Sequence, residues 1–410
     1  MSQKTLKDIF SNYTLNKANI FKNKDVLTDK YIPETIPHRE EQIKQIGMVI
    51  APTISGDKIS NIFIYGSTGT GKSVTVKYIT NELEKTSKNV KIIFVNCKMK
   101  RVSDTEYRLL AEVSRLLGTT IPPTGLPTDE VYRIFFKTLE SQKKSVILIL
   151  DEIDAMVKKV GDDILYTLTR LNQDLKYTKL SIIGISNDTS FTDKLDPRVK
   201  SSLSEEEIIF HPYDANQLRN ILTERAKEAF ADSVLDGAVI TKCAALAAQE
   251  HGDARRALDL LRIAGELAER DSSKKITTAF VDKAEERLDL DRIIEVVRAQ
   301  PRQSQAVLAG IIKLVESDYK NIQTGDIFNL YEKICHSRGL KTLTQRRLSD
   351  LIAELDMLGI INAQVISKGR YGRTREIKLH LSKNVLEKIK QILKDNYLLT
   401  DGLFLDKVKK

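Results

Sequence analysis

A glycine-rich segment has the residue types that bind phosphate groups. Residues 66–73 read Gly-Ser-Thr-Gly-Thr-Gly-Lys-Ser, which fits the pattern GxxxxGK[ST]. Glycines let backbone N–H groups wrap around phosphates, and a following helix adds partial positive charge. Lys72 offers a full charge to the β- and γ-phosphates of a nucleotide, and the hydroxyl of Ser73 suits Mg²⁺. An expected strand at 61–65 and a helix from about Val74 flank this segment, so it predicts a nucleotide site made of Gly66, Ser67, Thr68, Gly69, Thr70, Gly71, Lys72 and Ser73.

A second apolar run ends in two acidic residues. Val146–Leu150 is followed directly by Asp151 and Glu152. A buried parallel strand delivers such residues to the carboxyl edge of the sheet, where ligands bind in open α/β folds. We expect Asp151 to hold the Mg²⁺ shell and Glu152 to polarise the attacking water. Surface acids often follow strands, so the motif is weak alone, but it strengthens the prediction of a nucleotide site.

Three further residues are candidates for contacts with the nucleotide. Asn187 closes the apolar run SIIGIS, where its amide suits the lytic water or the γ-phosphate, although an Asn that caps the next turn is just as common. Arg198, in LDPRVKSS, and Arg255, in HGDARRAL, are candidate phosphate contacts. A single Arg is more often a solvated or ion-paired surface residue, so only placement near the pocket supports these two.

The elements that must position these residues form an α/β pattern. Four runs rich in Ile and Val, at 61–65, 91–95, 146–150 and 180–185, predict strands of parallel β-α-β units. Helical patterns at 103–117, with a capping box from Ser103 to Glu106, and at 129–139 separate the second run from the third. Ala-rich segments from 214 to about 290 predict a helical unit.

The last 120 residues differ from the rest in pattern and in charge. Helices expected at 324–337 and 344–358, with a turn at 338–339 and a hairpin at 360–380, predict a winged helix-turn-helix. Residues 291–410 hold 22 basic and 14 acidic side chains, whereas the first 290 residues hold 43 and 42. A basic terminal region beside a neutral body favours nucleic-acid binding. We therefore expect three domains: 1–212, the core with an amino-terminal arm; 213–290, a helical lid; and 291–410, the winged helix.

Two places in this region carry the candidate DNA contacts. The amino end of the expected recognition helix usually reaches bases and phosphates, and a basic hairpin can enter a minor groove. Winged helices also mediate protein contacts, so the charge excess is what favours DNA. With only Tyr371 near the hairpin tip and no Trp in the chain, duplex binding is favoured over stacking on single strands. The candidates are Thr344, Gln345, Arg346 and Arg347 in the helix, and Lys368, Arg370, Arg373 and Arg375 in the hairpin.

Composition excludes several other classes of protein. The 410 residues are 30% charged and 41% hydrophobic, as in globular proteins. No apolar run approaches the ~20 residues that cross a bilayer, and the amino terminus has no secretory h-region. Cys97, Cys243 and Cys335 are too far apart for CxxC or zinc-finger spacing. We expect an intracellular protein with reduced thiols and no membrane span.

Together these motifs resemble the AAA+ initiator ATPases, and in particular the archaeal origin-recognition proteins. The likeness runs from Tyr31-Ile32-Pro33 and Pro37-His38-Arg39-Glu40 to the hairpin, and so covers nearly the whole chain. It implies a P-loop AAA+ core with a parallel sheet, a helical lid and a C-terminal winged helix, which bind ATP or ADP with Mg²⁺. It also implies roles for individual residues. Pro33, His38 and Arg39 would lie near the adenine, Asn187 would be sensor 1, and Arg255 would be sensor 2, with Arg256 as the alternative. Arg198 would be an arginine finger offered to a neighbouring subunit, and residues 103–117 would be the initiator insertion.

The resemblance implies a replication initiator in the archaeal cytoplasm, associated with the nucleoid. It would bind double-stranded origin DNA and recruit or load the replicative helicase, the minichromosome maintenance complex, with paralogous initiators as further partners. ATP would act as a switch, with slow hydrolysis. Two rivals stay open at this point: a clamp-loader or Holliday-junction-type motor, which brisk DNA-stimulated hydrolysis would reveal, and a nucleotide-gated transcription regulator, which would mark promoters rather than origins.

Overall fold

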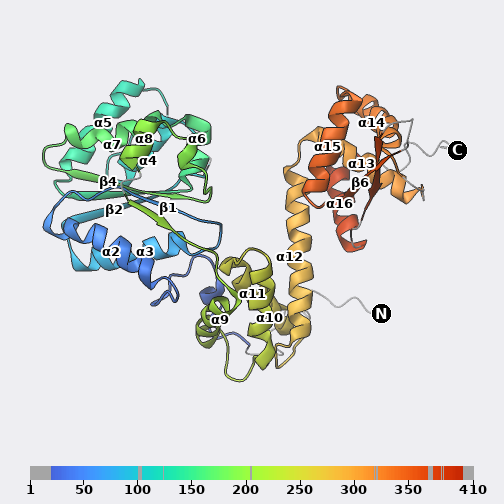
Figure 1. The fold of residues 1–410 in the computed structure, drawn as a ribbon, viewed down its shortest axis with the longest axis horizontal. Coiled ribbons are helices and arrows are strands. Elements are labelled where there is room, and N and C mark those ends of the chain that lie inside the picture. The colour runs from blue at the N-terminus through green and yellow to red at the C-terminus, as the bar shows by residue number, and fades with distance from the viewer. Residues whose placement is uncertain are drawn as a thin grey trace, which may run out of the picture. The chain divides into compact units, whose positions relative to one another are not determined.

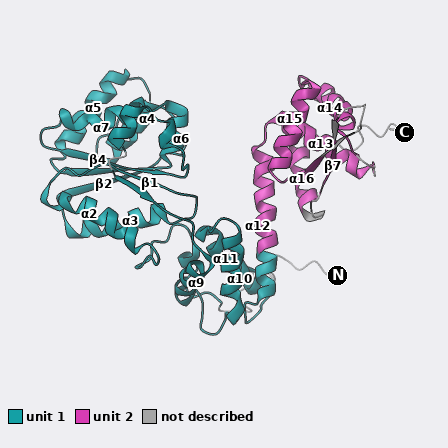
Figure 2. Cartoon of the chain, viewed as in Figure 1, with its two compact units in different colours: residues 1–284 teal, residues 285–410 magenta. Residues whose placement is uncertain are grey.

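The computed structural model describes residues 20–99, 104–122, 124–203, 206–317, 319, 322–367, 373–379, 381 and 383–399. The chain divides into two compact units, residues 1–284 and residues 285–410 (Figure 2). None of the helices in the described ranges combines the length and apolar character needed to cross a membrane.

A five-stranded sheet forms the centre of the first unit (Figure 1). Every strand pair is parallel, and the order is β2-β3-β4-β1-β5. The edge strand β5 escaped prediction because Glu206 and Glu207 interrupt its apolar pattern. The predicted α/β fold with a parallel sheet is confirmed. The strands are β1 (Ile62–Tyr65), β2 (Val90–Asn96), β3 (Ser145–Asp151), β4 (Lys179–Ser186) and β5 (Glu206–Ile209).

Helices cover both faces of this sheet (Figure 1). One face packs against α2 (Glu40–Ile50), η2 (Ala51–Ser55) and α3 (Lys72–Thr86). Because β3 is covered on both sides, all seven of its residues are buried. The opposite face packs against α4 (Glu106–Leu116), α5 (Thr128–Ser141), α6 (Ile153–Val160), α7 (Asp163–Arg170), η3 (Leu171–Gln173), η4 (Thr192–Lys194) and α8 (Pro197–Leu203).

The start of α4 differs from the prediction. The helix begins at Glu106, and its cap is Thr105, whose side chain accepts a hydrogen bond from the backbone N–H of Arg108. Thr105 has extended backbone angles, which an N-cap residue requires. The predicted capping box from Ser103 was therefore wrong, and Ser103 itself lies outside the described residues.

A helical lid follows the sheet. It contains α9 (Ala215–Ala229), α10 (Gly237–Gln249) and α11 (Ala254–Arg270), and it leads into α12 (Thr278–Ala299). The amino-terminal residues 20–27, with η1 (Lys24–Leu27), also belong to it, since η1 packs on α9 and α11. The boundary expected after residue 290 falls inside the continuous helix α12, whereas the two units divide between Ala284 and Glu285.

The second unit contains the winged helix. Its core unites α13 (Arg302–Glu316), α14 (Thr324–Arg338), α15 (Gln345–Met357) and α16 (Lys383–Asp395). An antiparallel hairpin pairs β6 (Asn362–Ser367) with β7 (Arg373–Lys378). Gly339 ends α14 in the left-handed conformation, which glycine adopts without strain. The predicted helix, turn, helix and hairpin are confirmed, while α13 and α16 were not foreseen.

Candidate functional site

The glycine-rich loop connects β1 to α3, as its flanking patterns predict. Gly66 follows the last residue of β1, and Lys72 is the first residue of α3. Gly69 has φ +70°, and the carboxylate of Asp253 lies so close that a Cβ at this position would collide with it. The lid helix α11 also contacts the loop directly, because Ala254 N donates to Gly69 O at 3.1 Å. Glycine at position 69 therefore allows two things: the left-handed backbone turn, and the close approach of the lid to the loop.

Lys72 is buried beneath this loop. Its Nζ donates to Gly66 O at 2.8 Å and to Ser67 O at 2.7 Å, and the residue is only 4% exposed. Burial lowers the pKa of Lys72 to about 8, although the neighbouring carboxylate of Asp151 acts in the opposite direction. The amine is thus charged at neutral pH but close to its titration range.

Two oxygen donors meet at the carboxyl end of β3. Ser73 Oγ donates to Asp151 Oδ1 at 3.1 Å, and both residues line the same cavity. Burial raises the pKa of Asp151, and the hydrogen bond from Ser73 counteracts part of that change. A hydroxyl and a carboxylate are the hard oxygen ligands that Mg²⁺ prefers, so these residues fit that ion.

Glu152 sits beside them in a strained backbone conformation. Its φ of 55° and ψ of 44° are left-handed, which is uncommon for a residue other than glycine and recurs at functional sites. The carboxylate lines the cavity and pairs with Lys98, with 3.3 Å between Nζ and Oε2. The sheet edge thus brings two acids together, one bonded to Ser73 and one held by a lysine.

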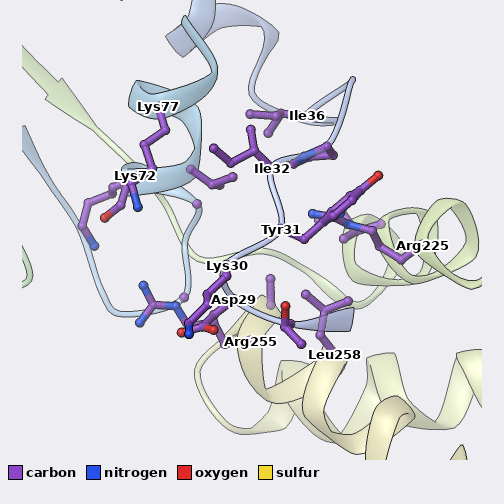
Figure 3. A pocket seen from close by; sticks show the side chains of 18 of the residues that line it. Asp29, Lys30, Tyr31, Ile32, Ile36, Lys72, Lys77, Arg225, Arg255 and Leu258 are labelled. Carbon is purple, nitrogen blue, oxygen red and sulfur yellow. The ribbon is translucent and has the colours of Figure 1, made fainter. Parts of the chain in front are cut away.

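A cavity of about 560 Å³ joins these groups to the lid. That volume lies in the range of small-molecule sites. Figure 3 shows Lys72 and Arg255 at one end of it and Tyr31 with Arg225 at the other. Gly69, Thr70, Gly71, Lys72 and Ser73 line the cavity together with Asp151, Glu152, Asn187, Arg255 and Pro33.

The two adjacent lid arginines have different surroundings. Arg255 lines the cavity, and its charge is near enough to act on Lys72. Arg256 is absent from the described cavity wall and forms an ion pair with Glu250, 3.0 Å from Nε to Oε2. Asp253 caps α11 by accepting from the backbone N–H groups of both arginines. Of the two adjacent arginines, Arg255 and not Arg256 lines the described cavity, and its contact with a nucleotide stays a prediction.

His38 and Arg39 lie outside the described cavity wall. Arg39 donates from Nε to Thr70 O at 3.0 Å and from Nη2 to His211 O at 2.6 Å, and it stacks on the ring of Tyr213. The His38 ring instead contacts the side-chain amide of Asn220 at 3.2 Å. Arg39 thus supports the phosphate-binding loop from outside, and direct nucleotide contacts by these two residues stay predictions.

Arg198 also lies away from the cavity in this chain. Its side chain is 71% exposed and pairs with Asp196, 3.0 Å from Nε to Oδ1. Its guanidinium also lies 5.4 Å from the ring centroid of Tyr166. An exposed position is what an arginine offered to a neighbouring subunit needs, and that role stays a prediction.

Sequence reasoning missed several residues of the cavity wall. Asn96 lines it from the end of β2, and the same signal that singled out Asn187, a polar residue closing an apolar strand, applies to it. The segment Thr28–Pro37 and Arg225 of α9 line the cavity as well. No local pattern marks Arg225, because it is one cation among several on an ordinary helix.

In the second unit, the first turn of α15 presents the predicted basic residues. Thr344 caps the helix by accepting from Arg347 N, and Gln345 and Arg346 are exposed. The guanidinium of Arg347 is shared between Asp350 at 3.6 Å and Glu354 at 3.9 Å. Of the two arginines, Arg347 is therefore already partly neutralised by its own helix.

The hairpin residues divide into three cases. Arg375 Nη1 donates to Ser349 O at 2.6 Å, so this half-buried side chain fastens β7 to α15 instead of projecting freely. Arg373 is the first residue of β7 and pairs with Ser367 in the ladder. Lys368 and Arg370 lie outside the described residues. The predicted DNA contacts of Arg373, Lys368 and Arg370 thus stay predictions.

Comparison with known proteins agrees with this domain order. Family models match for an AAA domain over residues 57–188, for the Cdc6 AAA+ ATPase-type lid domain over 219–286 and for the CDC6 C-terminal winged helix domain over 295–389. The chain is 52% identical to an ORC1-type DNA replication protein of Thermococcus onnurineus over 390 residues, which are 93% of each chain. It is 51% identical to the ORC1-type protein of Pyrococcus furiosus, with 93% of this chain and 92% of that one covered.

Solved structures show the same relationship. A structure of the Aeropyrum pernix ORC1 protein in complex with DNA matches with a TM-score of 0.80 and 42% identity, and the match covers 93% of this chain and 98% of that one. The Cdc6 protein of Pyrobaculum aerophilum matches with a TM-score of 0.57 and 22% identity over 92% and 99% of the two chains, which shows a shared fold. The ORC1-type proteins of Thermococcus onnurineus and Pyrococcus furiosus share about half of their aligned residues with this chain over nearly its full length. The chain therefore belongs to the archaeal family of ORC1-type DNA replication proteins.

Proposed function

We propose that this chain is a replication initiator that binds duplex origin DNA and uses ATP as a switch to recruit or load the replicative helicase. The observation that carries the proposal is the combination, in one chain of this family, of a preformed phosphate-binding cavity and a winged helix with a basic first turn. A solved relative, the ORC1 protein of Aeropyrum pernix, is described in complex with DNA. Double-stranded origin DNA, the minichromosome maintenance helicase and paralogous initiators are its proposed partners.

The cavity supports binding of ATP or ADP with Mg²⁺. Ser73 and Asp151 would hold the ion, which would supply charge neutralisation at the phosphates. Lys72 and Arg255 place positive charge at the phosphate end, and Asn187 orients the attacking water. Glu152 takes up a proton from that water, and within the described residues its pair with Lys98 involves only Oε2, so Oε1 is free to accept it. We expect slow hydrolysis, as suits a switch.

The winged helix supports the DNA half of the proposal. Thr344, Gln345 and Arg346 occupy the exposed end of α15, where helix-turn-helix proteins contact base edges and phosphates. Farther along α15, Asp350 and Asp356 are exposed and would repel phosphates. Only the first turn of this helix therefore suits close approach to a duplex. Arg375 aligns the hairpin with that turn through Ser349.

A binding assay across nucleotide states tests the proposal. The full chain is titrated against a mapped origin fragment and a scrambled duplex with ATP or ADP, and its hydrolysis is measured with and without DNA. We expect tighter binding to the origin fragment, an affinity or footprint that depends on the nucleotide, and slow turnover. Equal affinity for both duplexes with brisk DNA-stimulated hydrolysis would instead indicate a motor. Retention of the minichromosome maintenance helicase by the ATP form, and not by the ADP form, tests the loading step.

A further inference from the structure

The segment Thr28–Pro37, here called the strap, forms one wall of the nucleotide cavity. All of its residues line that cavity. Figure 3 shows the strap passing between α3, which carries Lys72 and Lys77, and α9, which carries Arg225. Within the described residues, the one backbone hydrogen bond donated by a strap amide beyond Thr28 runs from Tyr31 N to Thr28 O. The strap therefore depends on other contacts for its position.

Its two ends are fixed to different parts of the first unit. On the lid side, Phe21 stacks on Phe230 with 4.9 Å between ring centroids, and Lys24 pairs with Glu266 at 2.9 Å. On the core side, Arg39 lies two residues beyond the strap and bonds to Thr70 of the phosphate-binding loop. The strap thus bridges the lid and the loop along one wall of the cavity, so any relative movement of these two parts must change its path.

One contact holds the strap near its middle. Tyr31 Oη donates to Glu228 Oε2 at 2.6 Å, and the Tyr31 ring lies 4.7 Å from the guanidinium carbon of Arg225. The bond to Glu228 raises the pKa of Tyr31, so the phenol remains a donor at neutral pH. Thr35 adds a longer bond to Glu224, 3.4 Å from Oγ1 to Oε2. We call Tyr31, Arg225 and Glu228 the clasp.

The clasp contains a buried cation. Arg225 is 9% exposed, and its Nη1 has no hydrogen-bond partner among the described residues. Burying a cation with an unpaired donor costs free energy. The contact with the Tyr31 ring and the charge of Glu228 offset part of this desolvation cost for Arg225. Arg225 therefore adds both a favourable ring and charge contact and an unfavourable desolvation cost to the contact that holds the middle of the strap.

We propose that the Tyr31–Arg225–Glu228 clasp positions the strap over the cavity and thereby sets how long a nucleotide stays bound. The inference rests on the proposed role of the cavity as the ATP and ADP site. When the clasp opens, the middle of the strap leaves the wall and the nucleotide departs. Because Arg225 and Glu228 belong to the lid helix α9, a lid movement that shifts α9 also releases the strap.

Release of a fluorescent ADP from the full chain, chased with excess unlabelled ADP, tests the clasp. Tyr31→Ala removes both the hydrogen bond and the ring, and we expect release about tenfold faster, which corresponds to about 1.4 kcal/mol. Tyr31→Phe keeps the ring over Arg225 and should give an intermediate rate. Glu228→Gln keeps an acceptor but removes its charge, so its rate should also lie between those of wild type and Tyr31→Ala.

The matched control is Tyr319→Phe. Tyr319 Oη donates to Asp326 Oδ1 at 3.1 Å in the second unit, so this variant loses the same kind of bond away from the cavity. It should release ADP at the wild-type rate. Wild-type release rates in both Tyr31→Phe and Tyr31→Ala would overturn the clasp. Fewer binding sites with an unchanged release rate would overturn it too, because that result marks Tyr31 as needed only for folding. A wild-type chain that binds no ADP would refute the nucleotide site itself.

Discussion

The nucleotide cavity and the first turn of α15 hold their charged groups in opposite ways. In the cavity, Lys72 is 4% exposed and donates to two loop carbonyls, and Asp151 accepts from Ser73. On α15, Arg346 is exposed and Arg347 is held by carboxylates of its own helix. The cavity is therefore organised by the fold, whereas the proposed DNA contact of α15 would require Arg347 to exchange its carboxylate partners for phosphates.

That difference predicts how each region responds to substitution. A preorganised, partly dehydrated site concentrates its electrostatic effect in a few groups, so single changes should nearly abolish its function. An exposed surface in salt solution distributes its effect over many contacts, so single changes should be graded and dependent on ionic strength. The following predictions test this contrast, from the largest expected effect to the smallest.

Lys72→Ala should have the largest effect on nucleotide binding. It removes the buried charge that we propose attracts the phosphates and leaves the carbonyls of Gly66 and Ser67 without their donor. We expect loss of about 3 kcal/mol or more, roughly a hundredfold in ATP affinity, with duplex affinity mostly intact. Filter binding with labelled ATP measures the first quantity, and fluorescence anisotropy with duplex DNA measures the second. Undiminished ATP retention would refute the assignment of the cavity.

Glu152→Gln should separate binding from hydrolysis. The amide cannot accept a proton from water, but Lys72, Ser73 and Asp151 remain to hold the nucleotide. We expect a fall in turnover of about 10²–10⁴-fold with near-wild-type ATP affinity. Single-turnover hydrolysis compared with equilibrium binding provides the readout. Wild-type turnover in this variant would show that another group activates the water.

Arg346→Ala and Arg347→Ala should differ, which sharpens the contrast within α15. If Arg346 reads a base, its loss costs about 1–3 kcal/mol and relaxes sequence preference. Arg347 must first give up Asp350 and Glu354, so its loss should cost less. Affinities for a mapped origin fragment and a scrambled duplex measure both effects. If both variants lose the same affinity for the origin fragment as for the scrambled duplex, Arg346 contacts only phosphates and does not read a base.

Local sequence patterns predicted the parts of the site that lie close together in the chain. The strand–loop–helix unit around residues 66–73 and the acids after β3 follow from spacing alone, since each group is placed by an adjacent element. Much of the fold followed for the same reason, but helices α13 and α16 and the edge strand β5, whose exposed Glu206 and Glu207 obscure its periodicity, did not. The roles assigned to individual site residues remain predictions that the substitutions above address.

Long-range contacts escaped sequence reasoning. Tyr31 and Glu228 are 197 positions apart, and Arg39 meets His211 across 172 positions, so no periodicity connects them. Arg375 looked like one more basic hairpin residue until the packing of β7 on α15 brought it to Ser349. Sequence patterns thus indicate the charges available to a site, and tertiary packing determines which of those charges are already engaged.

The pH dependence of ATP binding should report the burial of Lys72. Burial lowers the pKa of Lys72 to about 8, and only the protonated amine attracts phosphates. ATP affinity should therefore begin to decline as the pH rises toward 8 and should decline more steeply above it, by at most about tenfold per pH unit for one proton. Isothermal titration at pH 7, 8 and 9 measures this, with circular dichroism as the control for folding. Duplex DNA affinity, which rests on arginines, should change less over the same range.

The smallest effect should come from Arg375→Ala, and its character distinguishes positioning from phosphate contact. The guanidinium of Arg375 is bonded to Ser349 O, so its loss chiefly loosens the hairpin on α15 and removes a charge that is not free to bond a phosphate directly. We expect a few-fold loss of duplex affinity with an unchanged slope of log K against log[salt]. Arg370→Ala/Arg373→Ala is the comparison, because each phosphate contact removed should reduce the magnitude of that slope by about 0.9. A salt series on one origin fragment gives both slopes.

If Arg375→Ala lowers the slope as much as a lost phosphate contact does, Arg375 leaves Ser349 on binding, and the hairpin surface is then less preorganised than the structure indicates. An unchanged affinity and slope for Arg370→Ala/Arg373→Ala would instead move the DNA contact from the hairpin to the insertion around α4.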